Sequence, residues 1–523
     1  MNPSSTAVLL PRRSLAGWAA LAVVMVVGSY VITILLALAC VYLPYLLIAS
    51  ITTNIQAWLL LLCGVVMATT ILWSLVPRRD NFVAPGPRLE QATQPRLFAE
   101  LENIAKALNE PMPREVYLIP DVNAWVAERG GTMGIGSRRV MGLGLPLMQM
   151  LTIPQFRAVL AHEFGHFYGG DTRLGPMVYR TRAAMVRTLV NLTSPSGPME
   201  ALTKIAIAHL AHVLVIAGLK GYWTLFLRAT QMVSRRQESR ADELACSLTG
   251  SQALIDGLCA IQKASTAMTS YWQTELAPAL QAGYRPPIAA GFGHFVAAPG
   301  VAQALSEHLE AELRKTGTNS FDTHPPLRSR IAAARALPNA RAVQSEASAI
   351  ALIDQLDTLE MQLLHARFPQ LKAAALKTVE WEKVGTDVFM PIWRTFTGEY
   401  ASLVTGLTAG SLPEAVKNVS EMGSRMRDPK GMLLTHEQRA NRAAALLWMS
   451  LALALIDGGW ELHAQPGESH LQHGATRMSP AEVIAAMRSG KLSPDAWRAQ
   501  CQAIGIADLR LDGETGNAHE QPA

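Results

Sequence analysis

Charged side chains are absent from one long stretch near the N-terminus, which runs from Ser14 to Pro77. A soluble domain does not normally present 64 consecutive residues without a charge. At a rise of about 1.5 Å per residue, the stretch is too long for one membrane crossing and suits two helices of about 20 residues. The polar cluster from Ser50 to Gln56 marks the turn between them. The lack of charge therefore predicts a transmembrane helical hairpin over residues 14–77.

Cysteine is also scarce. The five cysteines are odd in number, scattered and without a C-x-x-C pair: Cys40, Cys63, Cys246, Cys259 and Cys501. They exclude a disulfide framework and a thiolate zinc site, and they suit a reducing compartment. The net charge of +5 is modest, and no basic motif is interleaved with aromatic residues. We therefore expect attraction to a lipid bilayer and no nucleic-acid binding.

Arginines flank the apolar stretch at both ends, with Arg12 and Arg13 before it and Arg78 and Arg79 after it. The positive-inside rule then places both outer ends in the cytoplasm. We expect a multi-pass protein of the cell inner (plasma) membrane whose catalytic domain faces the cytoplasm. A cleaved signal peptide ending near Cys40 is the alternative, but the apolar region is longer than a usual signal core and a second apolar segment follows it.

What the chain does contain is a His-Glu-x-x-His run, His162 to His166, inside an apolar segment. Two histidines four positions apart on a helix point the same way, so both imidazoles can reach one metal ion. Glu163 stands beside the first histidine, where it can hold a water against the metal. A pair of hydrogen-bonded core histidines is the alternative, which is disfavoured because a buried carboxylate between them is costly without a cation.

The surrounding sequence predicts that this run is helical. Thr152, followed by Gln155, reads as a capped helix start, and apolar residues then recur at helical spacing until Gly169 and Gly170. Another amphipathic helix is indicated over Leu97 to Leu108. Three short strands are expected in addition: Val116 to Ile119, Ala124 to Val126, and Arg139 to Leu143.

A catalytic zinc ion takes a third protein ligand. The best candidates are Glu238 and Asp242, four positions apart on a predicted helix. One carboxylate can bind the metal while the other accepts a hydrogen bond from a ligating histidine and fixes its tautomer. A solvated charged helix face is the alternative, and it would be preferred without the upstream histidines.

Together these segments resemble the HtpX and CAAX-prenyl-protease group of membrane-bound gluzincin metallopeptidases. The matching pieces are Asn123-Ala124-Trp125, Val159 to His166, Ser234 to Glu238 with Ala241-Asp242, and Thr323 to Pro326 followed by Arg330-Ile331. The resemblance covers about residues 95–340. It implies one zinc ion (Zn²⁺) per chain, held by His162, His166 and Glu238.

The resemblance also implies roles for other residues. Glu163 would be the general base that activates a zinc-bound water, and Asp242 would hydrogen-bond a ligating histidine. His324 and Arg330 would belong to the wall of the active site. An extended substrate would pair with a strand at or beside Asn123, Ala124 and Trp125. An ordinary small sheet is the alternative for that strand.

The sequence thus favours an integral membrane zinc-dependent endopeptidase that cleaves membrane or membrane-proximal proteins, as in HtpX-like quality control. Its partners would be protein or peptide substrates and the bilayer, with prenylated peptides as less favoured substrates. The alternatives are a catalytically silent membrane scaffold and a zinc-regulated signalling protein, each binding partners through its C-terminal region.

Two further apolar stretches bear on the topology. Residues 205–227 lie between His166 and Glu238, which must be on the same side of the membrane. The number of crossings between them is therefore even. The intervening segment from Met177 to Leu192 carries three arginines and is a poor membrane partner, so we expect residues 205–227 to be buried, re-entrant or at the membrane surface. Residues 443–456 are short for a span, and we expect a core or interfacial helix there.

The predicted fold class is mainly α with a small β-sheet: a zincin-type α+β peptidase domain, an N-terminal two-helix transmembrane anchor and a helical C-terminal region. Residues 465–475 read as a polar linker, followed by helices that start at Ser479 and Ser493. The expected divisions are a cytoplasmic N-terminus (1–13), the transmembrane hairpin (14–77), the peptidase domain (80–340), a helical region of unknown role (341–464), a small C-terminal helical module (465–512) and a disordered tail (513–523).

Overall fold

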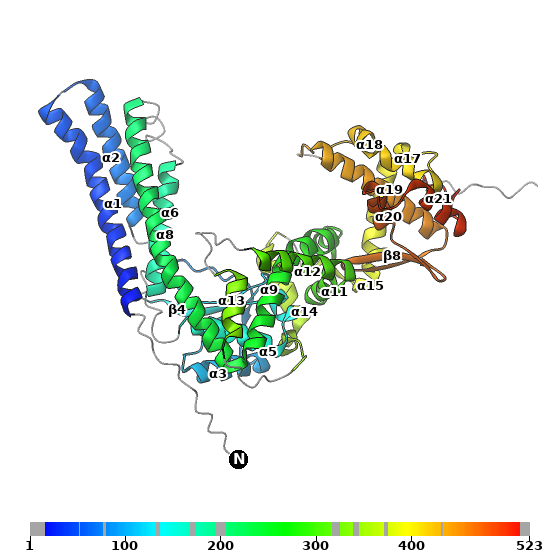
Figure 1. The fold of residues 1–523 in the computed structure, drawn as a ribbon, viewed down its shortest axis with the longest axis horizontal. Coiled ribbons are helices and arrows are strands. Elements are labelled where there is room, and N and C mark those ends of the chain that lie inside the picture. The colour runs from blue at the N-terminus through cyan, green and yellow to red at the C-terminus, as the bar shows by residue number, and fades with distance from the viewer. Residues whose placement is uncertain are drawn as a thin grey trace, which may run out of the picture. The chain divides into compact units, whose positions relative to one another are not determined.

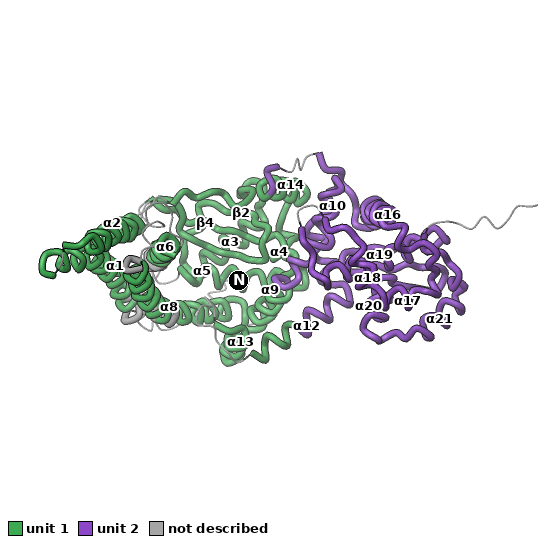
Figure 2. The backbone as a smooth tube through the Cα atoms, turned by 90° about the horizontal axis from the view of Figure 1, so that it is seen from above, with its two compact units in different colours: residues 1–263, 308–367 green, residues 264–307, 368–523 purple. Residues whose placement is uncertain are grey.

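The computed structural model describes residues 16–51, 53–76, 80–131, 136–167, 174–193, 206–315, 325–337, 345–370, 375–429 and 432–512. Its chain divides into two compact units, which are coloured separately in Figure 2. Unit 1 comprises residues 1–263 and 308–367, and unit 2 comprises residues 264–307 and 368–523.

Four long helices of unit 1 pack side by side (Figure 1). They are α1 (Ala16–Ser50), α2 (Ile55–Leu75), α6 (Leu174–Thr193) and α8 (Ala206–Thr249). Three segments of this bundle are long and apolar enough to cross a membrane: Val23–Ser50, Ile55–Leu75 and His209–Arg228. The predicted anchor of two apolar helices is confirmed, with its turn between Ser50 and Ile55.

Residues 206–227 form the upper part of α8, a single helix of 44 residues, and His209–Arg228 within it is a candidate membrane span. The expectation of a buried, re-entrant or membrane-surface segment at residues 205–227 stays a prediction. Helix α6 runs alongside α8 and α2. Two of its arginines contact these neighbouring helices. Arg182 donates to Thr230 Oγ1 at 3.1 Å, and Arg187 donates to the carbonyl oxygen of Ser74 at 3.3 Å.

A four-stranded sheet lies below the bundle in unit 1. Its strands are β1 (Arg88–Leu89), β2 (Glu115–Ile119), β3 (Ala124–Arg129) and β4 (Arg138–Gly144), in the order β1-β2-β4-β3. β2 and β4 are parallel, and the other two pairings are antiparallel. The three predicted strands are confirmed as β2, β3 and β4. Strand β3 is an edge of this sheet.

Helices cover the sheet and complete unit 1. α3 (Pro95–Leu108) packs on α5 (Ile153–Gly165), and α5 also contacts β3 and α8. The fully buried side chains of Leu97, Leu101, Phe156 and Phe164 form the core between α3 and α5. The remaining elements are α4 (Leu145–Met150), α9 (Ser251–Tyr271, which continues into unit 2), α13 (Leu327–Arg335), the 3₁₀ turn Ala349–Leu352 and α14 (Leu356–Arg367).

Unit 2 is built around α19 (His436–Asp457), whose apolar residues are buried by its neighbours. Although α19 is long and apolar enough to count as a candidate span, Leu446, Leu447, Leu451 and Leu455 are fully buried in the core of unit 2. This agrees with the expectation of a core helix. Trp497 also lies in that core and donates from its indole nitrogen to the carbonyl oxygen of Ala409 at 2.7 Å.

The polar linker expected at residues 465–475 is wrong. This segment belongs to an antiparallel sheet of β7 (Glu461–Gln465), β8 (Glu468–His473) and β9 (Thr476–Met478). Its strands are polar because one sheet face is exposed, while Ala464, Leu471 and Met478 are buried. The two predicted helix starts are confirmed by α20 (Pro480–Arg488) and α21 (Pro494–Ala503).

The other elements of unit 2 are short. They are a π-helical turn (Trp272–Leu276), α10 (Ala277–Gln281), β5 (Tyr284–Arg285), α11 (Ile288–Ala297), α12 (Pro299–Arg314, whose end belongs to unit 1), β6 (Lys377–Thr378), α15 (Trp381–Val384), a second π-helical turn (Gly385–Phe389), α16 (Met390–Glu399), the 3₁₀ turns Ala401–Leu403 and Ala409–Ser411, α17 (Leu412–Lys417) and α18 (Val419–Arg425).

Candidate metal centre

Helix α5 presents the two histidines of the His-Glu-x-x-His run. It begins with the predicted capping box, in which Gln155 N donates to Thr152 Oγ1 and Thr152 N donates to Gln155 Oε1. The helix ends at Gly165, with His166 as its C-cap, which is earlier than the sequence pattern indicates. Gly169 and Gly170 lie outside the described residues. His162 therefore stands in the last turn of α5 and His166 directly after it.

Helix α5 packs closely against α8, the helix that carries Glu238 and Asp242. A Cβ atom placed on Gly165 would lie 3.1 Å from Ala241 Cα and 3.3 Å from Ala241 Cβ. Glycine at this position lets the backbones of α5 and α8 approach without steric repulsion. The lower part of α8, which carries Glu238 and Asp242, is thereby held against the histidines.

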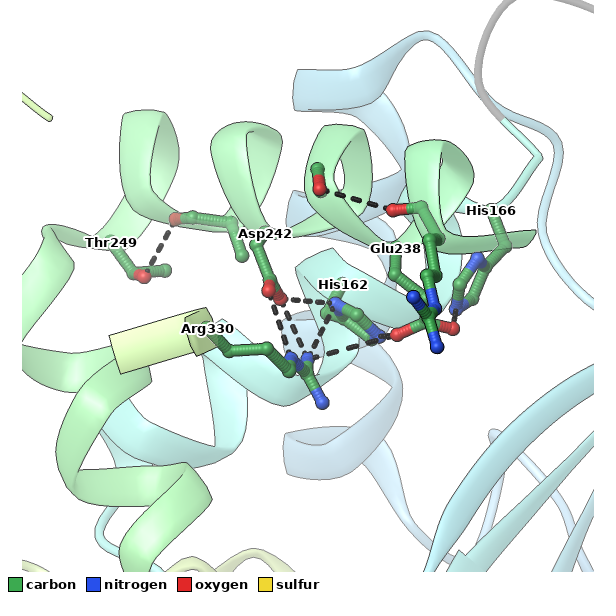
Figure 3. Close-up of polar contacts among 9 residues, drawn as sticks. His162, His166, Glu238, Asp242, Thr249 and Arg330 are labelled. Carbon is green, nitrogen blue, oxygen red and sulfur yellow. Dashed lines mark hydrogen bonds and ion pairs between the residues drawn. The ribbon is translucent and has the colours of Figure 1, made fainter. Parts of the chain in front are cut away.

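Three side chains of α5 and α8 converge on one point (Figure 3). Glu238 Oε2 lies 3.5 Å from His162 Nε2, and Glu238 Oε1 lies 3.6 Å from His166 Nε2. The donor atoms of the three residues all lie within 4.8 Å of one another. His162 and Glu238 are buried, whereas the side chain of His166 keeps 27% of its exposure. The cluster is thus open to solvent on the His166 side.

These distances fit a zinc ion. Two ligands bound to a tetrahedral zinc at about 2.1 Å are about 3.4 Å apart. The measured separations of 3.5 and 3.6 Å are close to that value. Two imidazole nitrogens and a carboxylate also form a donor set that zinc peptidases use, with a fourth position left open. The residues present therefore fit the metal.

Asp242 and Arg330 support His162 from the side away from this cluster. His162 Nδ1 lies 2.9 Å from Asp242 Oδ1. Arg330, from α13, donates to both Asp242 oxygens, from Nε at 2.9 Å and from Nη2 at 2.7 Å (Figure 3). Arg330 Nη2 is also 3.4 Å from His162 Nδ1, which is longer than its contact with Asp242. The Asp242 carboxylate can only accept a hydrogen bond, so His162 donates to it from Nδ1, and Nε2 carries no proton and can serve as a metal ligand.

The ionisation of this pair follows from its surroundings. Burial alone would raise the pKa of Asp242, but the hydrogen bonds from Arg330 and His162 outweigh it and lower the pKa to about 2. Burial alone would lower the pKa of Arg330, but its hydrogen bonds to Asp242 and the negative charges of Asp242, Glu238 and Glu163 raise it. Asp242 is therefore anionic and Arg330 cationic at neutral pH.

The other predicted site residues are placed as follows. Glu163 follows His162 on α5, is half-buried and acts electrostatically on Arg330. His324 lies outside the described residues. Asn123, Ala124 and Trp125 lie at the start of edge strand β3. There Asn123 is exposed, Ala124 is buried, and the Trp125 indole covers Gly142 of β4 so closely that a Cβ atom on that glycine would be 2.5 Å from Trp125 Cε2.

No local pattern indicates that Arg330 pairs with Asp242, because the two residues are 88 positions apart. The resemblance placed Arg330 in the active-site wall. In the structure its side chain is 11% exposed, and its guanidinium is directed at Asp242. Buried charges are paired, so the predicted burial of Glu238 and Asp242 implies that a cationic side chain from another segment lies beside them.

Comparisons with known proteins agree with this geometry. Residues 91–337 match Peptidase family M48. A relative described as "Protease HtpX homolog", from Acaryochloris marina (strain MBIC 11017), is 29% identical over 171 residues, which are 30% of this chain and 51% of the relative. The chain thus spans about half the length of this curated relative. No solved structure matches the chain. Residues 91–337 are therefore an HtpX-like metallopeptidase domain of family M48, in a chain whose apolar helices make it a membrane protein.

Proposed function

We propose that this protein is an integral membrane zinc endopeptidase that cleaves membrane or membrane-proximal proteins on the cytoplasmic side. The observation that carries the proposal is the cluster of His162, His166 and Glu238 on α5 and α8. The upper part of the same α8 is a candidate membrane span. The metal site and a candidate membrane span therefore share one helix.

In the proposed mechanism, His162 and His166 would hold zinc through Nε2, and Glu238 would hold it through its carboxylate. When bound, zinc supplies a Lewis acid that polarises a peptide carbonyl and acidifies water. The partial exposure of His166 leaves room on that side for water and substrate.

Glu163 acts as the general base and then as the general acid. Its carboxylate accepts a proton from the attacking water and delivers it to the leaving amine. The neighbouring Arg330 cation interacts electrostatically with Glu163.

Asp242 and Arg330 act through His162. Asp242 accepts the Nδ1 proton of His162, and Arg330 fixes both oxygens of Asp242. The His162 ring is thus oriented with Nε2 toward Glu238 and His166. We propose Asp242 and Arg330 as positioning residues.

Edge strand β3 supplies a surface for the substrate backbone. It contacts α5, and within the described sheet only β4 pairs with it. An extended peptide can add to such an edge through main-chain hydrogen bonds, which select for an unfolded segment and not for a particular sequence. Damaged or exposed segments of membrane proteins are substrates of that kind.

The proposal is tested by zinc content and cleavage of casein, measured on the purified full chain in detergent. We expect about one zinc per chain and cleavage in the wild type. Glu163→Gln should retain zinc and lose cleavage by about 10²- to 10⁴-fold, the usual contribution of a general base. His162→Ala should lose both. Wild-type cleavage by Glu163→Gln, or a wild-type protein that binds no zinc, would refute the mechanism.

A further inference from the structure

We propose that α8 sets a minimum distance between the membrane and the peptide bond that is cut. A membrane-anchored substrate then needs a cytoplasmic segment of about five extended residues between its transmembrane helix and its scissile bond. This inference rests on the proposed function and adds a rule for its substrates.

The membrane span and the metal ligand lie on one unbroken helix. α8 runs from Ala206 to Thr249, contains no proline, and holds both the candidate span His209–Arg228 and Glu238. Glu238 follows Arg228 by ten positions. At a rise of 1.5 Å per residue, the ligand is about 15 Å along the helix axis from the end of the span. If α8 is tilted from the bilayer normal, the distance from the membrane surface to Glu238 is shorter than this.

The candidate span ends at Arg228. Its twenty residues of α-helix are about 30 Å long, which equals the thickness of the hydrocarbon core. Helix α6 ties α8 and α2 together near these ends, because Arg182 bonds Thr230 of α8 and Arg187 bonds Ser74 in the last turn of α2. Arginines at this height suit the headgroup region.

The site end of α8 is held firmly as well. The backbones of α5 and α8 approach closely at Gly165, where an added Cβ atom would lie 3.1 Å from Ala241 Cα. One helical turn from the ligand, Asp242 is bound by Arg330 of α13. The ligand-bearing turn is therefore fixed to the peptidase domain, and α8 connects it rigidly to the bundle.

A second connection ties the end of α2 to the peptidase domain. Asp80, five positions after the end of α2, accepts hydrogen bonds from the Arg129 side chain at 2.9 and 3.1 Å and from Gly130 N at 2.8 Å. Asp80 N donates in turn to the carbonyl oxygen of Gly131 at 2.9 Å. The segment that follows α2 thus binds the end of β3. Five residues reach at most about 17 Å, so the end of β3 lies within about that distance of the end of α2.

The distance from the membrane to Glu238 sets the number of substrate residues needed between the bilayer and the scissile bond. An extended peptide covers about 3.3 Å per residue, so about 15 Å corresponds to four or five residues. A bond closer than this to a transmembrane helix cannot reach the metal unless the helix end is pulled out of the bilayer. Bonds farther out reach it freely. The rule does not depend on whether the segment lies before or after the transmembrane helix.

The test uses liposomes that contain the full chain and a single-span substrate whose casein-derived cleavable sequence is separated from the membrane by Gly/Ser spacers. The spacers place the scissile bond about two, four, six, eight and ten residues from the helix end. The same peptides without the anchor, and Glu163→Gln enzyme, are the controls. Cut positions are read by mass spectrometry.

We expect the anchored series to be resistant at about two residues, to rise at least tenfold in rate between about four and six, and then to level off, as the reach of α8 requires. The unanchored peptides should all be cut at one rate. Equal rates across the anchored series would overturn the distance rule and leave the proposed function standing. If neither series is cut, the proposed function fails, and the distance rule fails with it.

Discussion

Arg330 donates two hydrogen bonds to Asp242, and Asp242 lies 2.9 Å from His162 Nδ1. The three side chains come from α13, α8 and α5, so the histidine on one helix is oriented by charges from two others. Such partners of a ligating histidine tune the metal without touching it. The first two predictions concern this chain of contacts.

Asp242→Asn should weaken zinc binding or slow cleavage by about 10- to 100-fold, because the amide is a poorer acceptor for the Nδ1 proton. The protein should still fold and insert into membranes. Zinc affinity is measured by competition with a chelator. Glu243→Gln is the matched control, since Glu243 is the next residue on α8 and is exposed. Equal effects of the two substitutions would mean that Asp242 does not position His162.

Arg330→Lys should lower the stability of the metal-free protein at neutral pH and make that stability depend less on pH in acid. The pKa of folded Asp242 is lowered from 3.8 to about 2, so the folded state binds fewer protons than the unfolded state between these values. The resulting stability, about 2 kcal/mol, is nearly complete above pH 4 and is lost as the pH falls toward 2. Without the bidentate guanidinium, the pKa of folded Asp242 rises toward its unfolded value, so less stability is present at neutral pH and less is lost on acidification.

Unfolding of the metal-free protein, followed from pH 6 to pH 2, measures this shift. Arg328→Lys serves as the control, because Arg328 lies on the same helix and is exposed. Superimposable pH profiles for Arg330→Lys and Arg328→Lys would show that Arg330 does not set the ionisation of Asp242.

Gly165→Ala should separate α5 from α8. Its methyl group would meet the Ala241 backbone at 3.1 Å, so one helix must shift, at a cost of about 1–3 kcal/mol in the free energy of unfolding. Zinc affinity should fall too, because the ligands are on both helices. Gly218→Ala is the control: this glycine of α8 has open space around it, and alanine there should be neutral or stabilising. A stable Gly165→Ala protein with normal zinc affinity would contradict the close approach.

The topology can be read with reporter fusions. Fusions after residue 85 and after residue 340 should report the cytoplasm, and one near Thr53 should report the opposite side. Because the apolar part of α8 begins at His209 and runs toward the metal site, a fusion at residue 200 should also report the opposite side. A cytoplasmic signal at residue 200 would support the re-entrant interpretation of residues 205–227.

Local signals in the sequence were sufficient for most elements of unit 1. The Thr152–Gln155 capping box, the charge-free hairpin and the short strands each depend on neighbouring residues, and all of them are present in the structure. The site residues followed from two motifs with fixed helical spacing, and the structure brings His162, His166 and Glu238 together. Their zinc binding stays a prediction.

The failures share a physical cause, which is that they depend on tertiary contacts. The contacts of Arg182 and Arg187 of α6 with Thr230 and Ser74 join distant positions and leave no pattern in the sequence. The strands β7 to β9 look like a linker because only one residue in each strand is buried and the strands are short. The Arg330–Asp242 pair joins positions 88 apart and leaves no local pattern.

The continuity of α8 has a consequence for how this peptidase can be produced and how it can diverge. Helix α6 and the apolar half of α8 lie in the sequence between the two ligand motifs, and α8 itself carries Glu238. Deleting α1 and α2 would therefore leave the candidate span His209–Arg228 attached to the peptidase domain. A shorter form without that span would need the chain to be rejoined near the Arg182–Thr230 contact, where α6 and α8 are already adjacent.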